Sequence, residues 1–199
     1  MSPMVLVWVL VAYLSGSVPF GVIAARFFGG LDVRRHGSGN IGTANVLRTA
    51  GKGAAIVTLA GDLLKGYLPA FLAGLLALPP LEMAAVGLGA IVGHNWSCFL
   101  RFSGGKGVAT SFGVFLALAP LPALGSLVAW IGVLGCFRYT SLAALAASLA
   151  VPPLILLERG VGTFFWLSAL AALLIFVRHR DNIRRLQQGT EPRVGEQST

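Results

Sequence analysis

The stretch from residue 3 to residue 28, PMVLVWVLVAYLSGSVPFGVIAARFF, decides the fold class of this chain. A bilayer core about 30 Å thick is crossed by roughly 20 predominantly apolar residues in a helix, so the stretch predicts a transmembrane helix. A cleaved signal peptide is the alternative interpretation. No basic residue precedes Met4, and no convincing cleavage site follows the apolar core, so we expect a spanning anchor.

The composition extends this interpretation to the whole chain. Of 199 residues, 56% are hydrophobic and 11% charged, whereas soluble domains have about 45–50% apolar and about 25% charged residues. A soluble fold could not bury so much apolar surface. Further apolar stretches lie at residues 53–78, 83–100, 108–119, 122–137, 140–157 and 161–177. We therefore expect an all-α integral membrane protein with about seven transmembrane helices, forming a single domain over residues 1–199.

Basic residues are concentrated in alternate links between the apolar stretches. The links that carry them hold Arg34, Arg35, Arg48, Lys52, Arg101, Lys106 and Arg138, and the tail holds Arg178, Arg180, Arg184, Arg185 and Arg193. Because cytoplasmic loops carry the excess of Lys and Arg, we expect the N-terminus outside the cell and the C-terminus in the cytoplasm. Loops 29–52, 101–110 and 178–191 would then face the cytoplasm, with a flexible tail at 192–199. The net charge of +8 is confined to these short segments, so nucleic-acid binding is not expected.

The first polar segment, LDVRRHGSGNIGTANVLRTAGKG at residues 31–53, is too polar to span a membrane. Such a run can form a concave nest of backbone N–H groups around an anion. A helix starting near Gly42 would add its positive end, and Arg48 could clamp a phosphate by two parallel hydrogen bonds. The candidate binding residues here are Gly37, Ser38, Gly39, Asn40, Asn45 and Arg48. A flexible basic loop that follows only the charge rule remains an equally open alternative.

The second polar segment, RFSGGKGVAT at residues 101–110, places Gly104, Gly105 and Gly107 around Lys106. Three glycines let the backbone approach a ligand closely, and the lysine supplies a point charge. The spacing of an ATP-binding P-loop is absent, and no hydroxyl residue directly follows the lysine, so an ATPase is disfavoured. Upstream, His94 is more often a packed, hydrogen-bonded residue than a catalyst.

The third polar segment, VRHRDNIRRLQQGTEPR at residues 177–193, is predicted to extend the last helix until Gly189 and Pro192 end it. In a helix, His179 and Asn182 would share the stripe that faces the bundle. Arg180 and Arg184 would lie on another face, where anionic membrane lipids could bind them.

Two further polar features lie in or next to apolar stretches. Asp62 and Lys65 stand three residues apart inside the second stretch, where an unpaired charge would cost at least about 2.5 kcal/mol. We expect them to pair or to face a polar cavity; a structural ion pair is the favoured interpretation, and support of an active site is the alternative. Arg138 and Ser141 lie at another predicted helix boundary and could reach the same pocket as the loops.

Taken in order, GSGNIGTANVLR at 37–48, GHN with FSGGKGVAT at 93–110, and RHRDNIRRLQQGTE at 178–191 resemble the three signature loops of the acyl-phosphate:glycerol-3-phosphate acyltransferase family. SGSVPFG in the first stretch and GDLLKG around Asp62 and Lys65 extend the resemblance over nearly the whole chain. It implies transfer of a fatty acyl group from acyl phosphate to the 1-hydroxyl of glycerol 3-phosphate, giving lysophosphatidic acid and phosphate. It also implies a multi-pass protein of the bacterial cytoplasmic membrane, with no cofactor or metal.

The resemblance assigns roles by position. Ser38 and Arg48 match the essential residues of the first motif, the glycines around Lys106 match the phosphate loop, and His179 and Asn182 match the third motif. Glu191 matches its structural glutamate. The family usually has Ala-Thr-Asn where this chain has Thr43-Ala44-Asn45, so Thr43 is left out of the site.

The sequence holds no evident nucleophile with a partnered base, so we expect direct transfer without an acyl-enzyme. Asn40 or backbone N–H groups would stabilise the oxyanion, and a substrate phosphate or His179 would accept the proton. We expect all three polar segments to converge on one pocket.

Two other functions compete with an acyltransferase. A transporter of a phosphorylated solute would use Asp62 and Lys65 as a relay, but no internal repeat is evident. A membrane adaptor that binds anionic lipid would need the charge but not the glycine loops. The sequence does not decide the oligomeric state, and a monomer is our expectation.

Overall fold

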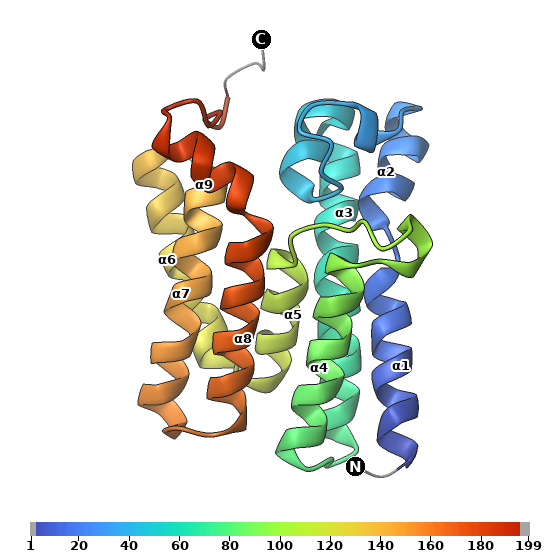
Figure 1. Ribbon diagram of the computed structural model, residues 1–199, viewed down its shortest axis with the longest axis vertical. Coiled ribbons are helices and arrows are strands. Elements are labelled where there is room, and N and C mark those ends of the chain that lie inside the picture. The colour runs from blue at the N-terminus through green and yellow to red at the C-terminus, as the bar shows by residue number, and fades with distance from the viewer. Residues whose placement is uncertain (1–2, 196–199) are drawn as a thin grey trace. The chain divides into compact units, whose positions relative to one another are not determined.

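The computed structural model describes residues 3–195, and over this range it contains helices joined by turns and loops, with no β-strand (Figure 1). The chain divides into two compact units, residues 1–114 and residues 115–199, each described here by itself. Helix α5 (Val108–Leu118) runs through the boundary between them.

The first unit is a bundle of long helices. Its elements are α1 (Pro3–Ser17), α2 (Phe20–Gly29), η1 (Val33–Arg35), α3 (Thr43–Leu75), α4 (Pro80–Asn95) and η2 (Cys98–Leu100), where η denotes a short 3-10 helix. Helix α1 packs on α3 and α4, and α2 packs on α3 (Figure 1). Glycines permit the close approach of α1 and α4: a Cβ added at Gly16 would lie 2.2 Å from the carbonyl oxygen of Ala90.

The first apolar stretch forms two helices because Pro19 lacks an N–H group and interrupts the helical hydrogen bonds. Helix α1 ends at Ser17 and α2 begins at Phe20. The stretch Met4–Gly29 is nevertheless long and apolar enough to cross a membrane. The break leaves the carbonyl of Val18 available, and it accepts hydrogen bonds from the Phe20 N–H at 3.1 Å and from Lys65 Nζ at 2.9 Å.

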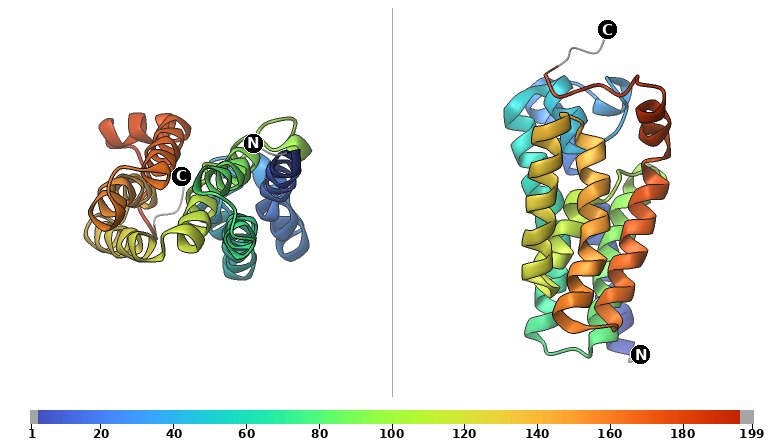
Figure 2. Two further views of the ribbon diagram at one scale, coloured as in Figure 1. Left: turned by 90° about the horizontal axis from the view of Figure 1, so that it is seen from below. Right: turned by 90° about the vertical axis from the view of Figure 1, so that its left-hand side faces the viewer.

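The second unit is built from α6 (Pro120–Phe137), α7 (Thr140–Arg159), α8 (Thr163–Arg178) and α9 (Arg180–Gln187). Helices α6 and α7 pair as a hairpin, and α8 packs on α7 (Figure 2). The hairpin turns at Arg138, which has left-handed backbone angles of φ 63° and ψ 16°.

Five segments are long and apolar enough to span a membrane, and six if α8 and α9 count as one bent span. They are Met4–Gly29, Thr43–Leu75, Pro80–Leu100, Pro120–Phe137 and Thr140–Arg159. Helix α5 has 11 residues and so covers only about 16 Å at about 1.5 Å per residue. The expected all-helical integral membrane protein is confirmed, with five to six candidate spans.

Two helix boundaries are informative. The helix predicted to start near Gly42 is confirmed, since α3 begins at Thr43 with Gly42 as its N-cap and is kinked at Gly51, where φ is 85° and ψ is 179°. The predicted extension of the last helix is present but bent, and it ends at Gln187, close to the predicted end at Gly189. Helix α8 ends at Arg178, and α9 follows after a bend of 62° at His179. His179 Nδ1 donates to the Ile175 carbonyl at 2.8 Å, which holds the ring back against α8.

Candidate active site

The loop between α2 and α3 is organised around the buried amide of Asn45. Its Nδ2 donates to the carbonyl oxygens of Val33 at 3.3 Å, His36 at 3.1 Å and Asn40 at 2.9 Å, and its Oδ1 accepts from the Ser38 N–H at 3.0 Å. Gly37 lies so close that an added Cβ would be 2.4 Å from Asn45 Oδ1. We expected Asn45 to bind substrate; in the structure its amide shapes the loop, and substrate binding by Asn45 stays a prediction.

The backbone N–H groups of this loop also face inward. The Ser38 N–H bonds to Asn45, the Gly39 N–H to the His36 carbonyl at 3.1 Å, and the Gly42 N–H to Asn40 Oδ1 at 2.8 Å. The expected nest therefore has at least three of its N–H groups engaged within the loop. Ser38 in the loop and Arg48 in α3 are exposed, as are Arg34, Arg35 and His36.

The basic residues of the loop are not equivalent. Asp32 caps η1 and binds Arg34 through contacts of 2.6 and 2.9 Å, while Arg26 lies 3.8 Å away. Hydrogen bonding from Arg34 holds the pKa of the Asp32 carboxyl well below its usual value. Arg34 thus has a partner inside the loop.

The glycines of the second loop pack against the end of α4. The Gly104 N–H donates to the Asn95 carbonyl at 3.2 Å and the Gly105 N–H to the His94 carbonyl at 3.0 Å. A Cβ at Gly105 would lie 2.1 Å from His94 Nε2, and one at Gly107 would lie 2.7 Å from Asn95 Oδ1. We expected these glycines to admit a ligand. In the structure these glycines pack directly against the end of α4. Lys106 is half-buried and lies just before α5.

Several polar side chains beside this loop are buried without a hydrogen-bond partner in the described part of the chain. They are both amide atoms of Asn95 and the hydroxyls of Thr110 and Ser111. Asn95 is fully buried at the end of α4, and Thr110 and Ser111 lie in the first turn of α5. Sequence reasoning named none of them as site residues, although Asn95 in the GHN motif was a usable signal.

Beneath the loop, Asp62 and Lys65 form the expected ion pair, with 2.8 Å between Oδ1 and Nζ. Both side chains are only 3% exposed, and His94 Nδ1 lies 3.6 Å from the same carboxylate oxygen. His94 is buried, as the packed alternative predicted. The contacts run from Lys65 through Asp62 and His94 to Gly105, so the ion pair lies directly behind the glycine loop.

In the second unit, His179 and Asn182 are buried at the bend between α8 and α9. Asn182 Nδ2 donates to Glu191 Oε1 at 2.6 Å, and Arg185 Nε donates to Glu191 Oε2 at 2.7 Å. Burial alone would raise the pKa of the Glu191 carboxyl. The nearby Ser141 hydroxyl and the hydrogen bonds from Asn182 and Arg185 outweigh burial and lower that pKa.

Arg138 and Ser141 were expected to bind substrate, and in the structure both lie near groups of the second unit. Arg138 Nη2 donates to the carbonyl of Val194 at 2.7 Å, and Ser141 contributes to the environment of Glu191. The first part of the expected flexible tail, residues 192–195, is held by such contacts, and residues 196–199 lie outside the described residues.

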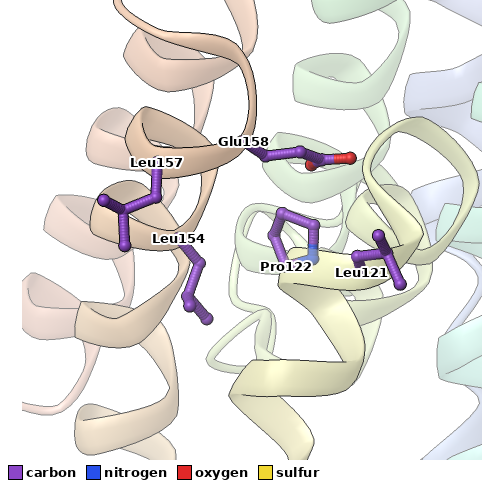
Figure 3. Close-up of a pocket in the computed structure, with 5 residues that line it drawn as sticks. All are labelled: Leu121, Pro122, Leu154, Leu157 and Glu158. Carbon is purple, nitrogen blue, oxygen red and sulfur yellow. The ribbon is translucent and has the colours of Figure 1, made fainter.

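Two cavities, one in each unit, are not lined by the loop residues. A cavity of about 280 Å³ in the second unit is lined by Leu121, Pro122, Leu154, Leu157 and Glu158 (Figure 3). A groove of about 410 Å³ in the first unit lies between α1, α2 and α3, and Lys65 is the one candidate site residue in its lining. Among the described residues, no group of three or more His, Cys, Asp or Glu side chains could hold a metal ion.

The sequence of this chain is similar to those of known proteins. Residues 6–189 match the family model described as glycerol-3-phosphate acyltransferase. A glycerol-3-phosphate acyltransferase of Rubrobacter xylanophilus is 48% identical over 190 residues, covering 96% of this chain and 95% of the relative. One from Geotalea daltonii is 46% identical over 186 residues, covering 94% and 95%.

Two solved structures are also similar. The crystal structure of PlsY (YgiH), an integral membrane glycerol 3-phosphate acyltransferase, in its glycerol 3-phosphate form has a TM-score of 0.92 and 36% identity, covering 96% of both chains. Its lysophosphatidic acid form has a TM-score of 0.88 and 35% identity, again covering 96% of both chains. The chain is thus an integral membrane acyltransferase of phospholipid synthesis. It belongs to the glycerol-3-phosphate acyltransferase family.

Proposed function

We propose that this chain transfers a fatty acyl group from acyl phosphate to the 1-hydroxyl of glycerol 3-phosphate, releasing lysophosphatidic acid and phosphate. The observation that carries the proposal is the family match over residues 6–189, which includes the first two motif loops and all but the last two residues of the third. The two PlsY structures, described as the glycerol 3-phosphate and lysophosphatidic acid forms, support the acceptor and the product.

Both substrates carry phosphate, so the site must supply positive charge and directed donors. We assign this to Ser38 and Arg48 of the first loop and to Lys106 of the second. Arg48 suits a bidentate phosphate contact, and Lys106 adds a compact charge before the N-terminus of α5. The glycines around Lys106 keep it in place by letting the loop lie directly on His94 and Asn95.

The reaction needs alignment more than activation, because phosphate is already a good leaving group. The 1-hydroxyl oxygen bonds to the acyl carbon, the bond from that carbon to the phosphate oxygen breaks, and the phosphate leaves with the electron pair. We assign stabilisation of the carbonyl oxygen to Asn40, whose own Oδ1 is fixed by the Gly42 N–H, or to backbone N–H groups. The acyl chain stays among the helices in the bilayer.

The hydroxyl proton passes to a phosphate oxygen of a substrate or to His179. Because His179 Nδ1 donates to the Ile175 carbonyl, the neutral ring carries its lone pair on Nε2. Nε2 is therefore the atom we propose as the proton acceptor, with Asn182 beside it as a substrate contact. The His179→Ala variant should lose turnover at saturating substrate, and no acyl-enzyme should be trapped; full turnover or a trapped acyl-enzyme would reject this assignment.

We further propose seven spans, with α5 as a short one, the N-terminus outside the cell, and the three loops on the cytoplasmic face of a bacterial inner membrane. The concentration of Arg and Lys in alternate links supports this orientation. In a background with Cys98 and Cys136 replaced by alanine, a membrane-impermeant thiol reagent added to intact cells should label a Val161→Cys variant and leave an Arg35→Cys variant unlabelled. The reverse pattern would reject the orientation.

The activity is tested with purified protein in detergent. Phosphate release should require both acyl phosphate and glycerol 3-phosphate, and mass spectrometry should detect lysophosphatidic acid. Phosphate release without glycerol 3-phosphate, or release without the lipid product, would contradict an acyltransferase.

A further inference from the structure

The turn between α6 and α7 holds the C-terminal segment by a reciprocal contact. The Val194 N–H donates to the Arg138 carbonyl at 2.8 Å, and Arg138 Nη2 donates to the Val194 carbonyl at 2.7 Å. Next to this pair, Arg193 Nε donates to the Tyr139 hydroxyl at 3.1 Å, and the Arg193 guanidinium lies 5.2 Å from the centre of the Tyr139 ring. Four groups on two consecutive residues of the turn thus engage two consecutive residues of the tail.

The held segment lies immediately after Glu191. Two residues of extended chain reach at most about 7 Å, so fixing Arg193 and Val194 restricts where Glu191 can go. The Glu191 carboxylate in turn binds Asn182 Nδ2 at 2.6 Å and Arg185 Nε at 2.7 Å. A continuous series of contacts therefore leads from Arg138 to Asn182, although 44 positions separate them in the sequence.

We propose that Arg138, Tyr139, Arg193 and Val194 form a tail clamp that positions Glu191 and, through it, the Asn182 side chain. This proposal rests on the proposed function, in which Asn182 contacts substrate. The members of the clamp are positioning residues. Without the clamp, Glu191 would be held only by its own hydrogen bonds and by those of the turn after α9, and Asn182 would lose its fixed rotamer for part of the time.

The clamp gives Arg138 a different role from the direct substrate contact that we expected from the sequence. The two roles differ in what they predict for a variant that keeps the charge of Arg138 but loosens the tail. If Arg138 acts through the clamp, kcat falls; if Arg138 contacts the substrate directly, kcat stays unchanged. Replacing Val194 by proline removes its N–H group and changes no charge, so it weakens the clamp and spares a direct substrate contact.

The first test compares Arg138→Gly, Val194→Pro and Arg159→Ala in the full-length protein. Glycine accepts the left-handed angles of Arg138 without strain, so it removes the guanidinium alone. Arg159 is the matched control, because its Nη1 also donates to a carbonyl, that of Leu118 at 3.0 Å, at the opposite end of α7. We expect kcat to fall roughly tenfold in both clamp variants, with KM for both substrates within about twofold, and Arg159→Ala to keep wild-type kcat.

The second test uses Glu191→Ala to separate the two roles of Arg138. If Arg138 acts through Glu191, the Arg138→Gly/Glu191→Ala double variant has the kcat of Glu191→Ala alone. A further fall in the double variant, or an unchanged kcat in Val194→Pro, would overturn the clamp.

Hydrogen exchange supplies a readout that does not depend on activity. The Thr190 N–H donates to the Arg185 carbonyl at 2.9 Å, next to Glu191, so its exchange should accelerate in both clamp variants and not in Arg159→Ala. Unchanged exchange at Thr190 would reject the clamp even if the wild-type protein proved inactive. Inactive wild-type protein with accelerated exchange in the variants would reject the proposed function and keep the clamp.

Discussion

Asp62 and Lys65 form an ion pair of 2.8 Å inside α3, in a segment that is long and apolar enough to cross a membrane. The pair is not isolated, because Lys65 Nζ also donates to the Val18 carbonyl at the break between α1 and α2, and His94 lies 3.6 Å from the Asp62 carboxylate. The buried pair thus connects the break between α1 and α2 with His94, the residue against which the glycine loop packs.

Removing one member of this pair should destabilise the protein strongly. The Asp62→Asn and Lys65→Met variants each leave a buried charge without its partner, for which about 3–5 kcal/mol is typical. The Asp62→Asn/Lys65→Met double variant removes both charges and should lose less than the sum of the single variants. Thermal unfolding in detergent measures all three, and single variants with the wild-type Tm would contradict a structural role for the pair.

The Gly107→Ala variant should lose activity through steric conflict. The added Cβ would lie 2.7 Å from Asn95 Oδ1, and the φ of +81° is unfavourable for alanine. We expect kcat/KM to fall roughly 100-fold as Lys106 is displaced. Gly132→Ala in α6 is the control, because nothing lies within 4 Å of its added Cβ. It should keep full activity, and equal activity of both variants would exclude the proposed packing of the loop.

Arg48 and Arg34 should differ in their effect on activity, although both are arginines of the same polar segment, residues 31–53. Charge-assisted hydrogen bonds contribute about 1.5–3 kcal/mol, so Arg48→Ala should lower kcat/KM for glycerol 3-phosphate roughly 10- to 100-fold. Arg48→Lys should recover part of the loss. Arg34→Ala removes a side chain already bound to Asp32 at 2.6 Å and should have an effect of less than about threefold. Equal losses in Arg34→Ala and Arg48→Ala would contradict this division of roles.

Stability should depend on acid pH through Glu191. Its native pKa is lowered from 4.5, so the folded protein binds this proton more weakly than the unfolded chain does. The stabilisation is therefore fully present above about pH 4.5 and is lost as the pH falls through the lowered native pKa. The difference in Tm between the wild type and Glu191→Gln should be constant at neutral pH and shrink below about pH 4.5. A difference that grows with acidity would contradict the lowered pKa.

Much of the fold was predictable because it depends on local pattern. In lipid the backbone must satisfy its own hydrogen bonds, so long apolar runs form helices, as α1, α3 and α7 show. The helix start at Thr43 follows from the glycine before it, and the pairing of Asp62 with Lys65 follows from their spacing on a helix. The family resemblance likewise needs only the order of the motifs along the chain.

The sequence by itself therefore determined a helical membrane protein, its family and the residues worth testing. Only the tertiary structure decided what those residues touch: Asn45 holds its own loop, Gly105 lies against His94, and Arg138 binds Val194. The physical reason is range. Hydropathy and helix spacing are properties of neighbouring residues, whereas these contacts depend on how a loop folds back on itself or on a helix, and the contact of Arg138 with Val194 spans 56 positions.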